Sequence, residues 1–232
     1  HLIDKRDCPS GHAIIQVDRT GQNCILLYGG ANQTNTEEYI DHVLARFGAE
    51  DIIVLQNEIN LNALIIEKAK QKGLTVALNP SPMDKTIKDL PLDMLDYLIL
   101  NEVEAASICG VYIGNAGLSS EGVTTAIVAL RAIAPQAAIL LTLGNKGAVY
   151  MDNTLLQSIG QGIFDTPVVD TTAAGDTFTG YFIAGIASGQ AASHALRLAS
   201  AAAALAVGRP GAAASIPLLA EAEWLAGYCS AD

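Results

Sequence analysis

Short apolar runs alternate with helix-forming segments along much of this chain, and this alternation limits the folds that it can adopt. Residues 51–55, 74–78, 97–100 and 138–143 each have the length and composition of a buried strand. Segments with helical periodicity lie next to them, at 37–47, 60–72, 101–109 and 120–134. Strands that are apolar throughout and alternate with helices are typical of a mostly parallel sheet covered on both faces. The pattern therefore predicts an α/β fold.

Capping residues indicate where several of the helices begin and end. Thr36 is the predicted N-cap of helix 37–47, and Gly48 is its predicted stop. Asn60 is the predicted cap of the next helix, which Gly73 ends. A second β-rich patch is expected at 148–159, and the last part of the chain is predicted to be helical at 175–187, 191–207 and 217–228.

The first thirty residues differ from the rest. Two β-rich runs, 12–17 and 23–28, are joined by a hairpin-like connection at 18–22. We therefore expect a small β lid over residues 1–30 and an α/β core over residues 31–232. With 232 residues the chain is long enough for one such domain with a large core.

Charge and composition exclude several kinds of partner. Thirteen basic and twenty-four acidic residues give a net charge of −11, which disfavours DNA and RNA. A small phosphorylated ligand stays compatible with that charge, because backbone amides can bind an anion locally. No apolar run reaches the ~20 residues that span a bilayer, so no membrane partner is expected. The four cysteines have no zinc-type spacing and are predicted to be reduced thiols of a cytoplasmic protein.

The segment 169–176, Val-Asp-Thr-Thr-Ala-Ala-Gly-Asp, carries the most specific chemical signal. It reads as a strand that runs into a turn of small residues and then into a helix. The first amides of a helix have no partner inside it, so such a turn can bind an anion. Asp176 lies at the same turn and could accept a proton from a substrate hydroxyl. An N-capping Asp beside a strand-to-helix turn is an equally good interpretation from the residues alone.

Two further motifs follow predicted strands. Asn101-Glu102-Val103-Glu104 opens a helix, and its first and last side chains lie on one helix face. Taken alone, this pattern indicates an ordinary capping box more than a functional site. The loop 142–147, Thr-Leu-Gly-Asn-Lys-Gly, ends a strand but is not a Walker P-loop, because no Gly-x-x-x-x-Gly-Lys-Ser/Thr occurs.

Segment 169–176, with its small-small-Gly-Asp turn, resembles the signature of the PfkB family of carbohydrate kinases, the ribokinase-like group. The resemblance covers nearly the whole chain. It implies a three-layer ribokinase-like fold with a mostly parallel central sheet and a small β lid. It also implies ATP-dependent phosphorylation of a sugar hydroxymethyl group and a homodimer formed through the lid. Asp176 would be the catalytic base, and the amides of Ala173, Ala174 and Gly175 would form an anion hole.

The resemblance also assigns cofactor and substrate residues. It implies ATP and Mg²⁺ contacts at Asn101, Glu104, Thr142, Gly144 and Gly147. It implies a monovalent cation, K⁺, with ligands matching Asp170, Thr172, Ala206, Arg209, Gly211 and Ser215, the last four mainly through backbone oxygen. A structural Gly-Pro loop is the alternative for segment 206–215.

Glu58 follows a predicted strand and matches a glutamate that touches the sugar in ribokinases, although a solvent-exposed loop glutamate is the alternative. Ribose is the leading substrate, with fructose, deoxyribose, a ketodeoxy sugar acid or a nucleoside still open.

Family members begin with a core strand, a sugar-binding Asp and a Gly-rich loop that are not found at the start of this sequence. Gly29-Gly30-Ala31-Asn32-Gln33 looks similar to that loop but follows the hairpin, so we expect it to lead out of the lid instead. We therefore expect an N-terminal piece to be missing, and chain 1–232 to bind ATP weakly without phosphorylating ribose measurably. A non-catalytic nucleotide-binding or regulatory remnant of such a kinase is the alternative function. A dinucleotide-binding oxidoreductase is disfavoured, because no Gly-x-Gly-x-x-Gly follows a strand.

Overall fold

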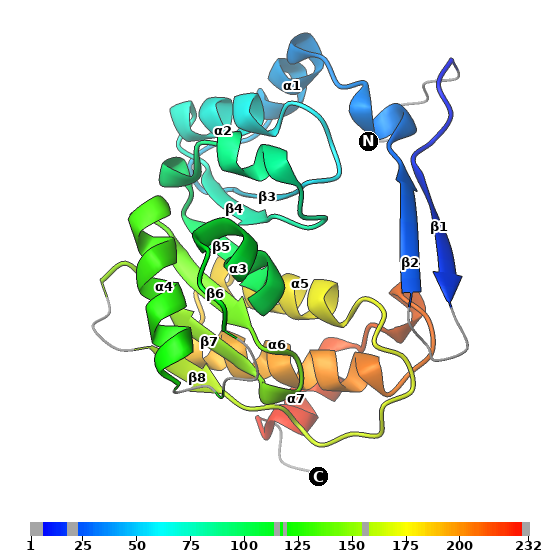
Figure 1. Ribbon diagram of the computed structural model, residues 1–232, viewed down its shortest axis with the longest axis vertical. Helices are drawn as coiled ribbons and strands as arrows, with labels where there is room; N and C mark the ends of the chain where they lie inside the picture. The colour runs from blue at the N-terminus through cyan, green and yellow to red at the C-terminus, as the bar shows by residue number, and fades with distance from the viewer. Residues whose placement is uncertain (1–6, 18–22, 114–116, 118–119, 155–157, 229–232) are drawn as a thin grey trace. The chain divides into compact units, whose positions relative to one another are not determined.

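The computed structural model describes residues 7–17, 23–113, 117, 120–154 and 158–228 (Figure 1). By compactness the chain divides into two units, His1–Leu95 and Asp96–Asp232. The two units are described separately below. The expected boundary at residue 30, between a β lid and an α/β core, stays a prediction.

An antiparallel hairpin opens the first unit, as the sequence predicts. Strands β1 (His12–Val17) and β2 (Asn23–Tyr28) pair in the register His12 to Tyr28 and Val17 to Asn23. The predicted connection at 18–22 lies outside the described residues. A short 3₁₀ helix, η1 (Gly30–Gln33), follows β2 and leads toward the next helix, as expected for this segment.

Close backbone contact holds the open end of the hairpin together. The amide of Ala31 donates to the carbonyl oxygen of Pro9 at 2.9 Å. Gly30 has a φ of +49°, and a Cβ at this position would lie 2.4 Å from the same oxygen. Glycine is therefore required at residue 30 for both its conformation and its contact.

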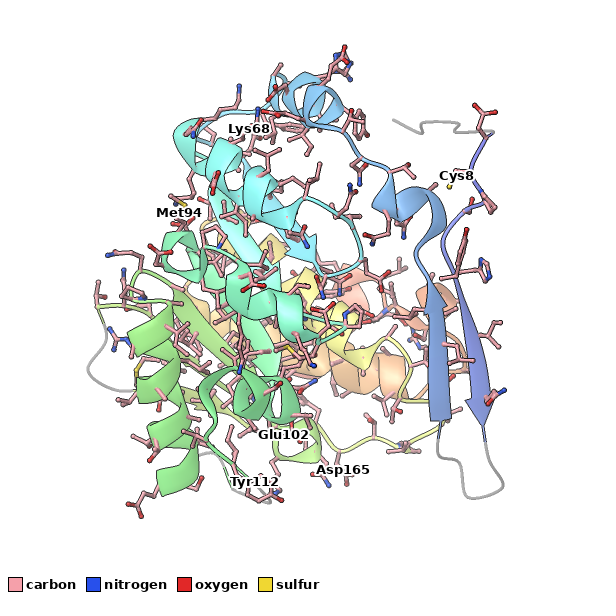
Figure 2. All side chains as sticks on the ribbon, turned by 45° about the horizontal axis from the view of Figure 1, so that its top comes forward. Cys8, Lys68, Met94, Glu102, Tyr112 and Asp165 are labelled. Atoms are coloured by element: carbon pink, nitrogen blue, oxygen red, sulfur yellow. The ribbon has the colours of Figure 1, made fainter. Side chains whose placement is uncertain are left out.

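Helices α1 (Glu37–Leu44) and α2 (Asn62–Gln71) pack together in the first unit. The Thr36 hydroxyl accepts the amide of Tyr39 and caps α1, as predicted. Lys68 of α2 forms ion pairs with Glu37 and Asp41 of α1, and these partners raise the pKa of Lys68 (Figure 2). The ion pairs join the two helices at their exposed edge.

The predicted cap of α2 is wrong. Leu61, with a φ of +65°, precedes the helix and makes no side-chain cap. The Asn60 side chain instead accepts the amide of Asn35 at 3.0 Å and donates to the Asn35 carbonyl oxygen at 2.9 Å. A partner 25 residues away therefore takes the side chain that local rules assign to the helix.

Strands β3 (Ile52–Gln56) and β4 (Thr75–Asn79) are parallel, with Gln56 opposite Asn79 at their carboxyl ends. Beyond these ends, Asn57 donates its amide to the Ser81 carbonyl oxygen and its side chain to the Pro82 carbonyl oxygen, each at 2.9 Å. The 3₁₀ helices η2 (Lys85–Asp89) and η3 (Leu92–Met94) complete the unit.

The second unit contains a mixed sheet. Strands β5 (Tyr97–Asn101) and β6 (Ala138–Thr142) are parallel, as predicted. The predicted β-rich patch supplies β7 (Ala148–Met151) and β8 (Ile159–Gln161), which pair antiparallel in the order β6-β7-β8. Its residues 155–157 lie outside the described part of the chain.

Helices cover both faces of this sheet, which gives the expected three layers (Figure 1). Helices α3 (Glu102–Cys109) and α4 (Glu121–Ile133) lie on one face, and α5 (Ala174–Ala187) and α6 (Ala192–Val207) on the other. The fully buried Phe182 of α5 contacts the rings of Tyr97 and Tyr150 on the sheet. Helix α7 (Leu219–Ala226) packs against α6. Within the described residues, every helix is too short or too polar to cross a membrane.

One predicted strand is absent. Val168 and Val169 are exposed and pair with no strand in the described chain. The amides of Val169 and Asp170 instead donate to the carbonyl oxygen of Val207 at 2.9 and 3.1 Å. The end of α6 therefore provides the hydrogen bonds that a neighbouring strand would have supplied.

Candidate functional site

A strained turn begins helix α5. Ala173 is the N-cap residue with a φ of +59°, in the left-handed region, and it makes no side-chain cap. This conformation costs an L-residue other than glycine roughly 1–2 kcal/mol. The amide of Ala174 makes a 3.3 Å hydrogen bond to the Thr171 carbonyl oxygen, and a Cβ at Gly175 would meet no atom within 4 Å. The turn therefore presents the positive end of a fourteen-residue helix to open space.

A cavity of about 400 Å³ lies on one side of this turn, and it has the size of a small-molecule site. Loop 142–147 contributes three of the residues that sequence reasoning assigned to the nucleotide. The first turn of α5, the segment 163–168 and one face of α6 contribute the rest. The lining includes Thr142, Gly144, Gly147, Phe164, Asp165, Thr171, Ala174, Phe178, Ser200 and Val207.

Gly147 has a structural role as well as a place in this lining. Its φ is +99°, and a Cβ there would lie 2.0 Å from the carbonyl oxygen of Gln161 on β8. The close approach of β7 and β8 therefore requires glycine at this position, whatever binds in the cavity.

Asn101 and Glu104 form a capping box. The Asn101 side chain accepts the amides of Val103 and Glu104 at 2.9 Å, and the buried Glu104 carboxylate accepts the amide of Asn101 at 2.9 Å. The motif therefore forms the capping box that its residues alone predict. Asn101 is also the register partner of Thr142, so the two lie side by side at the carboxyl ends of β5 and β6.

Asp176 lies apart from that cavity. It is exposed in the first turn of α5 and lines a second cavity of about 430 Å³. Thr177, Tyr181, Gln190 and Ile216 line the same space. The first turn of α5 therefore separates the two cavities, with Ala174 on one and Asp176 on the other.

Two of the predicted cation residues, Thr172 and Gly211, are hydrogen-bonded to a third, Asp170. Its carboxylate accepts the amide of Thr172 at 2.9 Å and the amide of Gly211 at 3.0 Å. Hydrogen bonds from the side chain and amide of Thr172 and from the amide of Gly211 lower the pKa of Asp170. The Arg209 amide donates to the Ala206 carbonyl oxygen at 3.0 Å, at the end of α6.

Ser215 is fully buried and donates its hydroxyl to the Ala212 carbonyl oxygen at 2.7 Å. Asp170 and segment 206–215 therefore offer carboxylate and carbonyl oxygens as possible cation ligands. Among the described residues, no three His, Cys, Asp or Glu side chains gather closely enough to hold a metal ion.

Glu58 belongs to the first unit. It lies two residues after β3, as predicted, and its side chain is exposed. Its backbone carbonyl oxygen accepts the Gln33 side chain at 3.0 Å, and a contact with sugar stays a prediction.

Sequence reasoning missed Ser200. Its hydroxyl is buried and has no hydrogen-bond partner among the described residues, and Ser200 lines the first cavity. Ser200 is the one polar residue in the run 199–207, Ala-Ser-Ala-Ala-Ala-Ala-Leu-Ala-Val, which was interpreted as a buried helix. A single hydroxyl in such an apolar helix is a signal that could have identified it.

Comparison with known proteins identifies the fold and family. Residues 1–219 match the model of the pfkB family carbohydrate kinases. The ribokinase of Staphylococcus aureus (strain COL) is 32% identical over 225 residues, which cover 95% of this chain and 71% of the relative. The structure of Arabidopsis thaliana ribokinase complexed with ribose and ATP matches with a TM-score of 0.81 and 30% identity, covering 96% of this chain and 71% of that one.

A third match agrees with these. Ribokinase from Cryptococcus neoformans in complex with ADP has a TM-score of 0.83 and 29% identity over 94% of this chain and 72% of that one. The expected ribokinase-like α/β fold is therefore confirmed. The chain belongs to the pfkB family of carbohydrate kinases and is an ATP-dependent sugar kinase.

Proposed function

We propose that the protein transfers the γ-phosphoryl group of ATP to a sugar hydroxymethyl group, with ribose as the leading substrate. The observation that carries this proposal is the position of the first turn of α5 between two cavities. A donor in the first cavity and an acceptor beside Asp176 would meet at the positive end of that helix. Phosphoryl transfer needs this arrangement, because it relies on positioning and on donors aimed at the developing charge.

Asp176 would act as the general base. An exposed carboxylate in the first turn of a helix can accept a proton from a hydroxyl placed beside it, within hydrogen-bond reach. The amides of Ala173, Ala174 and Gly175 would stabilise the transferred group. The long 3.3 Å bond from Ala174 to Thr171 leaves that amide only weakly engaged in the protein.

The nucleotide would occupy the first cavity. Thr142, Gly144 and Gly147 lie on its loop side, and Ser200 offers an unmet hydroxyl on its helix side. The ribokinases solved with ATP or ADP support the use of this nucleotide. The proposal of ribose rests on Glu58 as a hydroxyl contact and on the ribokinase relatives.

We expect two metal ions, Mg²⁺ and K⁺, to bind through oxygen ligands. Mg²⁺ would be held near Asn101 and Glu104, whose motif adjoins Thr142 at the sheet edge. When bound, Mg²⁺ neutralises charge on the phosphate oxygens. K⁺ would be held by Asp170, Thr172 and the carbonyl oxygens of loop 206–215, the kind of ligand set that suits this ion. We expect K⁺ to activate better than Na⁺ by stabilising the loop beside the anion hole.

Substitution of Asp176 tests the function. In the intact protein we expect Asp176→Asn to lower turnover by roughly 10²–10⁴-fold, because a general base contributes about that much, with ATP affinity little changed. Sugar-dependent release of ADP measures turnover, and a fluorescent nucleotide titration measures binding. Asp93→Asn is a matched control, since Asp93 is an exposed carboxylate in the first turn of η3.

Near-normal turnover in Asp176→Asn would remove this residue from the mechanism. ATP binding by the unsubstituted protein without ADP release for any of the sugars would instead favour a nucleotide-binding remnant. A panel of ribose, deoxyribose, fructose and a nucleoside distinguishes the possible acceptors.

A further inference from the structure

Glu221, in the first turn of α7, has a carboxylate with three hydrogen bonds. One oxygen accepts the Arg209 Nη2 at 2.6 Å, and the other accepts the Leu218 amide at 2.7 Å and the Arg209 Nη1 at 3.4 Å. The pair is therefore bidentate, which fixes the direction of the guanidinium as well as its distance. These bonds raise the pKa of Arg209 and lower that of Glu221, so both groups are charged near neutral pH.

The partner of Glu221 belongs to loop 206–215. Two residues later in this loop, the Gly211 amide donates to Asp170 at 3.0 Å. Pro210, with its restricted backbone, is the one residue between these two points of attachment. The loop is thus held from one side by α7, through Arg209, and from the other by Asp170.

Stability is a poor explanation for this ion pair. The side chains of Arg209 and Glu221 are 34% and 42% exposed, and ion pairs at such exposure contribute little to the free energy of unfolding. We expect its effect to be local instead. By fixing the Arg209 side chain, the ion pair would also limit the movement of the Arg209 backbone carbonyl oxygen.

We propose that Glu221 is a positioning residue for the monovalent-cation loop, which it holds in its cation-binding conformation through Arg209. This inference rests on the cation site proposed above. Nothing in it requires Glu221 to touch the ion. Partners of this kind, one step removed from the ligands, typically change metal affinity by roughly 10–100-fold when they are lost.

The test measures cation binding without relying on catalysis. The melting temperature is recorded while K⁺ replaces tetramethylammonium at constant ionic strength, because a ligand that binds the folded state raises it in a concentration-dependent way. We expect Glu221→Gln to need roughly tenfold more K⁺ for the same stabilisation, with little change in melting temperature without K⁺. An amide oxygen at residue 221 still accepts the Leu218 amide, so the start of α7 is preserved.

Two further variants separate positioning from damage to α7. Arg209→Gln leaves the Glu221 carboxylate on the Leu218 amide and should shift the K⁺ midpoint as Glu221→Gln does, and it provides the test if Glu221→Gln does not fold. The matched control is Glu121→Gln, which removes an exposed carboxylate from the first turn of α4 and should leave the midpoint unchanged.

The possible outcomes separate failure of the positioning role of Glu221 from failure of the proposed cation site. If the unsubstituted protein shows no K⁺-dependent stabilisation, the cation site is refuted and the inference falls with it. If that protein responds to K⁺ and the Arg209 and Glu221 variants share its midpoint, the cation site stands and the positioning role is overturned. A lower melting temperature at every K⁺ concentration with an unchanged midpoint would show a merely structural ion pair.

Discussion

Ser200 has a buried hydroxyl that forms no hydrogen bond within the part of the chain that the structure describes. A buried polar group without a partner costs free energy, so its presence in the apolar second half of α6 needs a compensating role. Ser200 lines the cavity proposed for the nucleotide, where a hydrogen-bonding ligand would supply the missing partner.

Ser200→Ala should therefore separate stability from binding. Without nucleotide we expect the free energy of unfolding to stay the same or rise by about 1 kcal/mol, because the unsatisfied group is removed. ATP affinity should fall by roughly 3–10-fold, the worth of one hydrogen bond. Denaturant unfolding and calorimetric titration measure the two quantities. Ser193→Ala, at an exposed position of the same helix, is the control, and unchanged ATP affinity in Ser200→Ala would remove the hydroxyl from the site.

Capping residues show how far local sequence rules reach. Thr36 and Asn101 were predicted as caps from their neighbours, and both accept amides of the helices that they precede. Asn60 also precedes a predicted helix and was predicted as its cap, but its side chain bonds to Asn35. The rule that succeeds twice fails once because it considers only a few residues on each side, whereas hydrogen-bond partners compete across the whole fold.

At the scale of elements, Asp170 links two segments that are distant in sequence, the turn before α5 and loop 206–215. The pKa of its carboxyl is lowered in the folded protein by the Thr172 and Gly211 hydrogen bonds. Such a group adds stability above its unfolded-state pKa of about 4. That stability is lost as the pH falls through the lower folded value.

Asp170→Asn should therefore flatten the acid side of the stability profile. The difference in unfolding free energy between the unsubstituted protein and the variant should be constant above about pH 5 and shrink below about pH 4. Urea unfolding across this range provides the measurement, with Asp89→Asn, an exposed carboxylate in η2, as the control. A difference that does not vary with pH would contradict a folded-state role for the ionised carboxylate.

Elements were predictable where their stability is local. Most of the strands and helices occur within one or two residues of the ranges expected from apolar periodicity, but the end of α1 differs by more, since α1 stops at Leu44 and not at residue 47. Val168 and Val169 were mistaken for a strand because β-branched residues favour one, while their actual partner is the end of α6. The cavity proposed for the nucleotide was predicted at loop 142–147 and at Ala174 alone, because its other walls come from segments remote in sequence.

At the scale of the whole molecule, the hairpin exposes apolar side chains of a kind that is usually buried in the core or at an interface. Ile14 and Leu26 are both 54% exposed, and they face each other in the pairing of β1 with β2. Exposed apolar strands of this kind are typical of interfaces. We propose that a second copy of the chain covers this face and forms the homodimer that the family resemblance implies.

The double variant Ile14→Lys and Leu26→Lys should therefore convert a dimer to a monomer, because it places charges in the apolar contact. Light scattering after gel filtration gives the mass. Val103→Lys, which changes a 72% exposed residue on α3, should leave the dimer intact. Either a monomeric unsubstituted protein or a dimeric double variant would argue against the hairpin as the interface.

The division of the chain at residue 95 also has a consequence for how such an enzyme can diversify. The loop at 142–147, the first turn of α5 and the cation loop are all encoded downstream of that point, whereas Glu58 is encoded upstream. A recombination event near the boundary would replace Glu58, the candidate sugar contact. It would keep Asp176 and the residues proposed to bind the nucleotide. Such an exchange would change one proposed contact of the acceptor, while the proposed general base and the residues proposed to bind ATP would stay the same.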